Sequence, residues 1–227
     1  MTRLHPSPRA VFIVLEGIDG SGTTTQTGLL AQHLAGRGRP VLPTREPSGG
    51  PIGRLLRELL LGRHGLPDGS AVDGRAMALL FAADRRDHLA REIDPALAEG
   101  RDVVTDRYLL SSLAYQAEEA DATWVEGLAI GARVPDLTLL LDVPIAHASD
   151  RRARAGRPAE RYDADLVLER VAESYRRLAA GSPEGGSRFG KIVVIDGAAS
   201  VAEVARAVAA SADELLVTLA CAYQEMD

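Results

Sequence analysis

Short apolar runs alternate with longer segments whose apolar residues recur at helical spacing along most of this chain. The short runs predict strands at residues 11–15, 40–44, 102–105, 137–143 and 191–195. The longer segments predict helices at residues 23–36, 52–61, 71–98, 110–132, 164–180 and 201–222. Strands and helices in this alternation are typical of an α/β fold, in which helices flank a parallel sheet that here has five strands.

Length and composition fit one globular domain. The chain has 227 residues, of which 46% are hydrophobic, and this is enough to bury a substantial core. We find no internal repeat and no linker, so we expect a flexible leader at residues 1–10 and a single domain at residues 11–227. The chain has one cysteine, Cys221, which excludes an internal disulfide.

The net charge of −6 argues against a general binder of nucleic acid or of membrane surfaces. An anionic ligand must therefore be bound by local positive charge, and this is supplied by arginine because Lys191 is the only lysine. No apolar run reaches membrane-spanning length, and no hydrophobic secretion signal opens the chain. We therefore expect a cytoplasmic protein.

A glycine-rich segment, EGIDGSGTTT at residues 16–25, lies between the first predicted strand and the first predicted helix. Its glycines allow backbone N–H groups to converge on one anion, to which the helix N-terminus adds positive potential. The segment fits the phosphate-binding pattern G-x-x-x-x-G-K-[ST] except at Thr23, which replaces the lysine. A tight turn without a ligand is the alternative. The expected phosphate-binding residues are Gly17, Ile18, Asp19, Gly20, Ser21, Gly22, Thr23, Thr24 and Thr25.

Polar residues also follow the second and third predicted strands, and ligands of open parallel sheets bind at the carboxyl ends of the strands. Arg45 can offer its planar guanidinium to a phosphate, although an ion pair with Glu46 is equally compatible with the sequence. Asp106 closes the third strand, where it can hold a metal-bound water or orient Arg107.

Two further clusters suit a nucleobase. Phe81 and Arg85 are one helical turn apart, so a ring and a guanidinium share a face; a core phenylalanine beside a solvated arginine is the alternative. Ser112, Tyr115 and Gln116 occupy one flank of a later predicted helix, where they can read a base edge, crowd a sugar or simply serve as neutral polar residues of a buried helix.

Residues 150–162 carry five arginines, at positions 151, 152, 154, 157 and 161. A run of charge is usually a solvated face. Because this run follows the fourth predicted strand of an acidic chain, it is instead interpreted as a mobile lid that closes over a polyphosphate.

Taken together, these motifs resemble those of the thymidylate kinase (dTMP kinase) family, a group of P-loop nucleoside monophosphate kinases. The likeness extends from residue 11 to the end of the fifth strand, and in this order the motifs are specific. The resemblance implies a P-loop NTPase-type three-layer sandwich with a short arginine-rich lid. The segments that carry it are EGIDGSG at 16–22, TREPSGG at 44–50, FAADR at 81–85, DRYLLSSLAYQ at 106–116 and PDLTLLLDV at 135–143.

The resemblance implies transfer of the γ-phosphoryl group of ATP to dTMP, which gives dTDP and ADP for dTTP synthesis. It also implies a homodimer and an Mg²⁺ ion held by Thr24 and Asp106, partly through water. The implied catalytic residues are Asp19, Arg45, Arg107, Arg154 and Arg157. The implied dTMP-binding residues are Asp19, Arg45, Phe81, Arg85, Arg107, Ser112, Tyr115 and Gln116.

Thr23 is the departure from the family pattern. Loss of one preorganised charge of this kind costs about 3–4 kcal/mol of transition-state stabilisation. Lys191 is expected at a sheet edge away from the site, so our hypothesis is that one of the arginines at 151–161 makes the missing β/γ-phosphate contact. Two alternatives are a catalytically impaired nucleotide-binding paralogue and a kinase for another deoxypyrimidine monophosphate.

Overall fold

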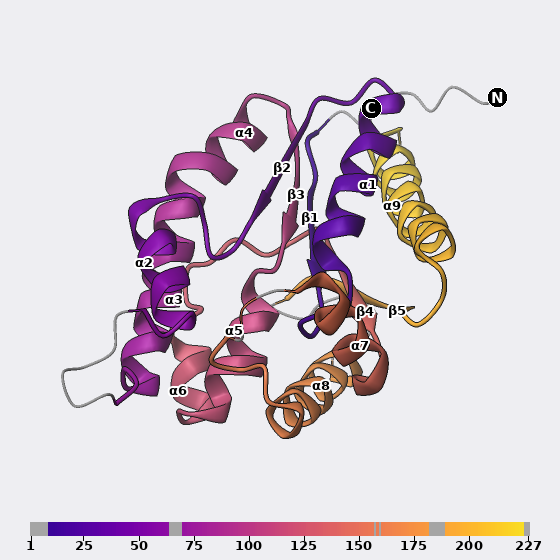
Figure 1. The fold of residues 1–227 in the computed structure, drawn as a ribbon. Coiled ribbons are helices and arrows are strands. Elements are labelled where there is room, and N and C mark those ends of the chain that lie inside the picture. The colour runs from indigo at the N-terminus through magenta and orange to yellow at the C-terminus, as the bar shows by residue number, and fades with distance from the viewer. Residues whose placement is uncertain (1–8, 64–69, 157, 159, 182–188, 225–227) are drawn as a thin grey trace.

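The structure is a computed structural model that describes residues 9–63, 70–156, 158, 160–181 and 189–224. It contains a five-stranded parallel sheet with the order β2-β3-β1-β4-β5 (Figure 1). All five predicted strands are confirmed, with ends shifted by at most about one residue, and Lys191 starts an edge strand as expected. The strands are β1 (Phe12–Glu16), β2 (Val41–Arg45), β3 (Asp102–Asp106), β4 (Leu137–Asp142) and β5 (Lys191–Asp196).

Helices follow most strands along the chain, as the alternating pattern predicted. The prediction for residues 23–36 coincides with α1, and those for residues 52–61, 164–180 and 201–222 match α2, α8 and α9 within about two residues. The bounds are α1 (Thr23–Gly36), α2 (Pro51–Leu60), α7 (Ile145–Ala155), α8 (Asp165–Ala180) and α9 (Val201–Gln224).

Two long predicted helices are wrong in detail. Residues 71–98 form α3 (Gly74–His88), a π-helical turn (Leu89–Ile93) and α4 (Asp94–Ala98). The Asp73 carboxylate caps the first of these by accepting hydrogen bonds from two backbone N–H groups, so the helix starts later than predicted. Pro95, which lacks an N–H group, lies at the start of α4, just after the π-helical turn.

Residues 110–132 likewise do not form one helix. They begin as α5 (Leu109–Tyr115), continue as a 3₁₀ turn (Gln116–Glu118), and resume as α6 (Ala122–Gly127). Asp121 caps α6 by accepting a hydrogen bond from the backbone N–H of Trp124, and this local bond starts a new helix instead of extending the previous one.

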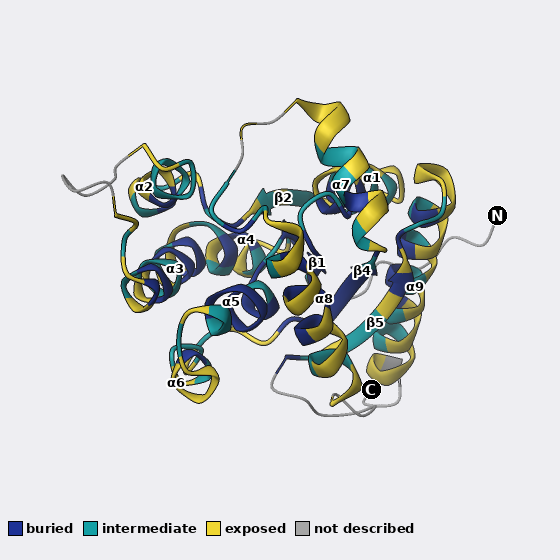
Figure 2. Cartoon of the chain, turned by 60° about the horizontal axis from the view of Figure 1, so that its bottom comes forward, coloured by how far each residue is buried: buried dark blue, intermediate teal, exposed yellow. Residues whose placement is uncertain are grey.

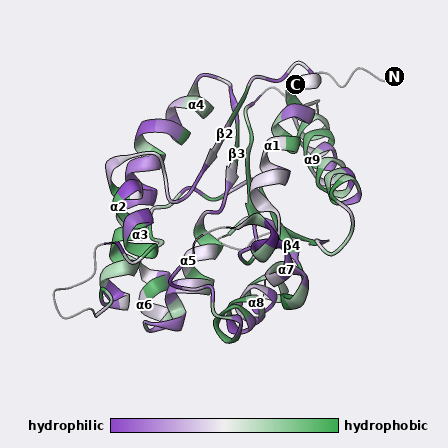
Figure 3. Cartoon of the chain, in the orientation of Figure 1, coloured by the Kyte–Doolittle hydropathy of each residue, from purple (hydrophilic) through white to green (hydrophobic). Residues whose placement is uncertain are grey.

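Two hydrophobic clusters cover the two faces of the sheet and make the fold a three-layer sandwich. Alternate residues of β1 belong to different clusters, as period-2 side-chain geometry requires. Val11, Ile13 and Leu15 pack with α1 and α9, whereas Phe12 and Val14 pack with α3, α4, α5 and α8. Figure 2 shows the buried central strands β1 and β4 between partly exposed helices, and Figure 3 shows helices such as α8 and α9 with both hydrophobic and hydrophilic residues.

The sheet order brings the polar strand ends together. β1 lies between β3 and β4, and the register places Leu15 beside Asp106 and Asp106 beside Arg45. The segment after β1 and the residues that close β2 and β3 are therefore neighbours at one edge of the sheet. This edge carries the candidate site.

Candidate active site

A cavity of about 630 Å³ lies at the carboxyl ends of β1, β2 and β3. Arg85, Gly17, Ile18 and Arg154 do not line it, and Arg157 lies outside the described residues. The other predicted site residues all do: Asp19, Gly20, Ser21, Gly22, Thr23, Thr24, Thr25, Arg45, Phe81, Asp106, Arg107, Ser112, Tyr115 and Gln116.

The loop between β1 and α1 depends on its glycines for space. Gly17 and Gly20 have φ values of 155° and 90°, which side-chain-bearing residues rarely adopt. A Cβ atom on Gly20 would lie 2.4 Å from the carbonyl oxygen of Ala148, so the loop packs directly against α7. Gly22 precedes α1 without a capping side chain, so the first N–H groups of this helix remain available to an anion.

Thr24 and Asp106 form a pair at the floor of the cavity. The Thr24 hydroxyl donates a hydrogen bond to Oδ2 of Asp106. Oδ1 of Asp106 is buried and has no hydrogen-bond partner among the described residues. A hydroxyl beside a carboxylate oxygen with spare accepting capacity fits Mg²⁺, which commonly takes one or two protein oxygens and completes its shell with water and phosphate.

Arg107 links the third strand to the loop between β1 and α1 (residues 17–22), which we call the phosphate loop. Its φ of 71° is the left-handed conformation, which is uncommon for arginine. Its guanidinium donates to the Gly17 carbonyl at 2.5 Å and to the Asp19 carboxylate at 2.9 Å. Burial disfavours the charged form of the Arg107 guanidinium, but Tyr115 and Asp19 beside it raise the pKa of Arg107 well above its usual value. The group is therefore a fixed cation at the cavity.

Glu16 supports Arg107 from behind, a role that the sequence analysis missed. This fully buried carboxylate accepts hydrogen bonds from the Ser111 hydroxyl at 2.5 Å and the Tyr175 hydroxyl at 3.0 Å. Both hydroxyls also lie within 3.4 Å of the Arg107 guanidinium. Burial raises the pKa of Glu16, and the Ser111 hydrogen bond opposes that shift. Only its place at a strand end, before the glycine loop, could have signalled this role.

Arg85 and Ser112 meet at the other end of the cavity. The buried Arg85 guanidinium donates a hydrogen bond of 2.7 Å to the Ser112 hydroxyl, which lines the cavity. Phe81 also lines it, from the same helix as Arg85. Tyr115 accepts a hydrogen bond of 3.0 Å from the backbone N–H of Asp19, so its hydroxyl contacts the phosphate loop, and it lines the same cavity as Phe81.

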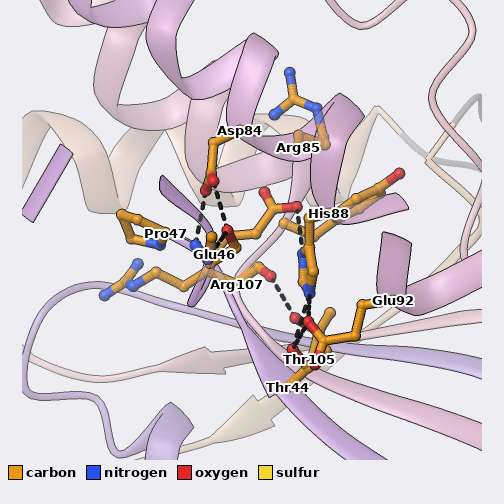
Figure 4. Close-up of polar contacts among 12 residues, drawn as sticks. Thr44, Glu46, Pro47, Asp84, Arg85, His88, Glu92, Thr105 and Arg107 are labelled. Carbon is orange, nitrogen blue, oxygen red and sulfur yellow. Dashed lines mark hydrogen bonds and ion pairs between the residues drawn. The ribbon is translucent and has the colours of Figure 1, made fainter. Parts of the chain in front are cut away.

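A buried network fixes the segment that begins with Arg45. Figure 4 shows His88 between Glu46 and Glu92. Its Nδ1 lies 3.2 Å from Oε1 of Glu46, and its Nε2 lies 3.0 Å from Oε2 of Glu92 and also contacts the Thr44 hydroxyl. Burial disfavours the charged imidazole, but the Glu46 carboxylate raises the pKa of His88. Burial also raises the pKa of Glu46. The network ties the end of β2 to α3, the helix that carries Phe81 and Arg85.

Arg57 is a second residue that the sequence analysis missed. It lies on α2, donates a hydrogen bond to the Pro47 carbonyl and lines the cavity. Burial lowers its pKa, and the nearby Arg45 lowers it further, so the two guanidiniums share one region. No motif marks Arg57, because only folding brings α2 over the end of β2.

The arginine-rich segment divides into two groups. Ala148 is fully buried against the phosphate loop, and residues three and four positions later share its helical face. Accordingly, Arg151 and Arg152 donate hydrogen bonds to carbonyl groups of the loop and line the cavity. Arg154 points elsewhere, with 82% of its side chain exposed, and Arg161 pairs with Glu119 at 2.9 Å.

A glycine loop at the switch point of a parallel sheet, facing convergent arginines across one cavity, defines a P-loop nucleotide-binding protein of the phosphotransferase kind. The family model for thymidylate kinase matches residues 15–208, and the chain belongs to this family.

The chain is similar to named members over most of its length. It is 42% identical over 219 residues to the thymidylate kinase of Bifidobacterium longum (strain NCC 2705), covering 90% of this chain and 98% of that protein. It is 44% identical over 198 residues to a protein of Pyrococcus abyssi named "Probable thymidylate kinase", covering 86% of this chain and 92% of that protein.

Proposed function

We propose that this protein transfers the γ-phosphoryl group of ATP to dTMP, forming dTDP and ADP. Family membership supports this reaction, and the two relatives described above are named thymidylate kinase and "Probable thymidylate kinase". The observation that carries the proposal is a single cavity that connects the phosphate loop to the Phe81–Ser112 region. Donor and acceptor can therefore meet between the two ends of this cavity.

Arg45, Arg57 and Arg107 would bind the acceptor phosphate, since all three line the cavity on the side of β2 and β3. That phosphate is already an anion near neutral pH, so the reaction needs alignment and positive charge more than a strong base. Alignment of two reactants contributes about 7–11 kcal/mol in favourable cases. Asp19, bonded to Arg107, would lie between the two substrates.

Thr24 and Asp106 would hold Mg²⁺, with Asp106 acting partly through water. Bound together with ATP, the ion would neutralise phosphate charge. The two protein oxygens would fix its position at the start of α1, and the N–H groups of the loop would orient the phosphates.

The base and sugar would be recognised at the far end of the cavity. Phe81 would stack on thymine, and Ser112 and Gln116 would face the base edge. Arg85 does not line the cavity but is bonded to Ser112, and from there it would donate to thymine O4. Tyr115 would stand against C2′ of the sugar and disfavour a ribose 2′-hydroxyl.

A catalytically impaired paralogue is less consistent with the site, because the arginines of the acceptor end line the same cavity as the phosphate loop. An enzyme-coupled assay that detects the ADP formed from ATP would test the proposal with dTMP, dUMP, dCMP and dGMP in turn. We expect turnover with dTMP well above that with the others. Preference for another deoxypyrimidine monophosphate would make the protein a kinase for that nucleotide. Turnover with none of the four would favour the catalytically impaired, nucleotide-binding paralogue.

We further propose that the protein is cytoplasmic and that it acts as a homodimer, the latter as the family resemblance implies. Among the described helices, none combines the length and the apolar character needed to cross a membrane. Light scattering of the purified protein would test the dimer directly.

A further inference from the structure

The phosphate loop lacks the cation that its sequence pattern normally contains. Thr23 occupies the lysine position and starts α1, with its side chain buried at the cavity. A hydroxyl cannot supply the charge that lysine would bring to the β- and γ-phosphates. Lys191 cannot replace it either, because it starts the edge strand β5 and pairs with Glu214 of α9.

We propose that Arg152 supplies this missing charge, contacting the β- and γ-phosphates of ATP in place of a loop lysine. The proposal rests on the proposed use of ATP and adds a residue that the family motif does not provide. Arg152 lines the cavity and donates a hydrogen bond of 2.8 Å from Nη1 to the Asp19 carbonyl of the loop.

The position of Arg152 along the loop distinguishes it from Arg151. Asp19 accepts from Arg152 through its carbonyl and from Arg107 through its carboxylate, at 2.8 and 2.9 Å. Arg152 therefore lies at the end of the loop nearest the acceptor arginine. Arg151 instead bridges Ser21 to Gly197, the residue that follows β5, at 3.3 and 2.9 Å.

The surroundings of Arg152 hold the guanidinium near the loop before a nucleotide arrives. Its side chain is 12% exposed and lies 3.0 Å from Asp165 and 3.7 Å from Asp163. Asp165 itself is 60% exposed, so solvent screens much of its charge. Nη2 also donates to the Ser149 hydroxyl at 2.9 Å. These contacts permit a purely structural role, in which Arg152 only ties α7 to the start of α8.

A charge-relocation experiment separates the two roles. Arg152→Ala, Thr23→Lys and the double variant would be compared with the unaltered protein in ATP binding with Mg²⁺, by calorimetry, and in kcat and KM with dTMP. We expect Arg152→Ala to weaken ATP binding about tenfold or more and to lower kcat/KM by about 100-fold or more. Thr23→Lys should restore most of both losses in the double variant, because lysine returns the charge from α1 but cannot rejoin α7 to α8.

Two further variants keep the test decisive. Arg152→Gln retains a hydrogen-bond donor without the charge, so it should show the same losses of ATP binding and of kcat/KM that we expect for Arg152→Ala. It therefore still tests the proposal if the alanine variant fails to fold. Arg91→Ala removes an exposed arginine that pairs with Asp87 and does not line the cavity, so it should change neither quantity. Unchanged ATP binding in Arg152→Gln, or an equal loss with and without the Thr23→Lys substitution, would overturn the proposal. If dTMP is not the acceptor, the calorimetric comparison still gives an answer, so the two failures are distinguishable.

Discussion

The Arg85 guanidinium donates a 2.7 Å hydrogen bond to the Ser112 hydroxyl, and this contact joins α3 to α5 at the end of the cavity that we propose binds the base. Replacing Arg85 with alanine should lower kcat/KM for dTMP by about 10- to 150-fold, since a hydrogen bond from a charged group contributes about 1.5–3 kcal/mol. The loss should fall mainly on KM. Steady-state kinetics with Arg86→Ala, which removes the exposed neighbouring arginine, provides the control.

Tyr115 should exclude ribonucleotides by the bulk of its ring. We expect Tyr115→Ala to raise activity with UMP relative to dUMP by about tenfold, the scale typical of one small steric difference. Tyr115→Phe keeps the ring and loses only the hydroxyl that bonds Asp19, so it should keep the preference for deoxyribose. The ratio of kcat/KM values for the two nucleotides is the measurement. Equal ratios in the two variants would argue against a steric role.

Asp106 should control metal use rather than nucleotide binding alone. Asp106→Asn keeps the shape of the side chain but removes the charge beside Thr24. We expect the Mg²⁺ concentration for half-maximal activity to rise by about 10- to 100-fold, as for other groups that hold a metal through water. ATP binding measured with EDTA present should change little. A variant with an unaltered Mg²⁺ titration would remove Asp106 from the metal site.

The buried pair of His88 and Glu46 should make stability depend on pH. The folded-state pKa of His88 is raised, so its contribution is fully present below the unfolded pKa of about 6.5 and is lost as pH rises through the higher folded value. The raised pKa of Glu46 acts in the same direction. His88→Asn should therefore cost about 3–5 kcal/mol near pH 6 and clearly less near pH 9. Urea denaturation of both proteins at the two pH values measures the difference, and an equal cost at both would contradict this account.

Much of the site follows from the sequence because its residues are tied to strand ends. The alternating pattern located all five strands, and parallel strands necessarily bring Asp19, Asp106 and Arg45 to one edge. Helix-borne residues were harder to place. Arg57 reaches the cavity only because α2 lies over the end of β2, and Glu16 supports Arg107 through Ser111 and Tyr175, which are distant in sequence.

The arginine-rich segment shows a similar limit. Its sequence does not reveal which guanidiniums reach the loop. That depends on which face of α7 packs against the loop, and in the structure it is the face of Ala148, which lies against Gly20. The packing turns Arg152 inward and leaves Arg154 exposed. Charge density predicted a lid in this segment, but the packing of α7 decides which of its arginines reach the loop.

The most direct test of the central claim follows the phosphoryl group itself. Purified protein would be incubated with Mg²⁺, dTMP and ATP labelled at the γ-phosphate, and the nucleotides would be separated. We expect the label to appear in dTDP, in step with ADP, and to be absent when dTMP is omitted. Label that stays in ATP, or that is released only as inorganic phosphate, would contradict the account.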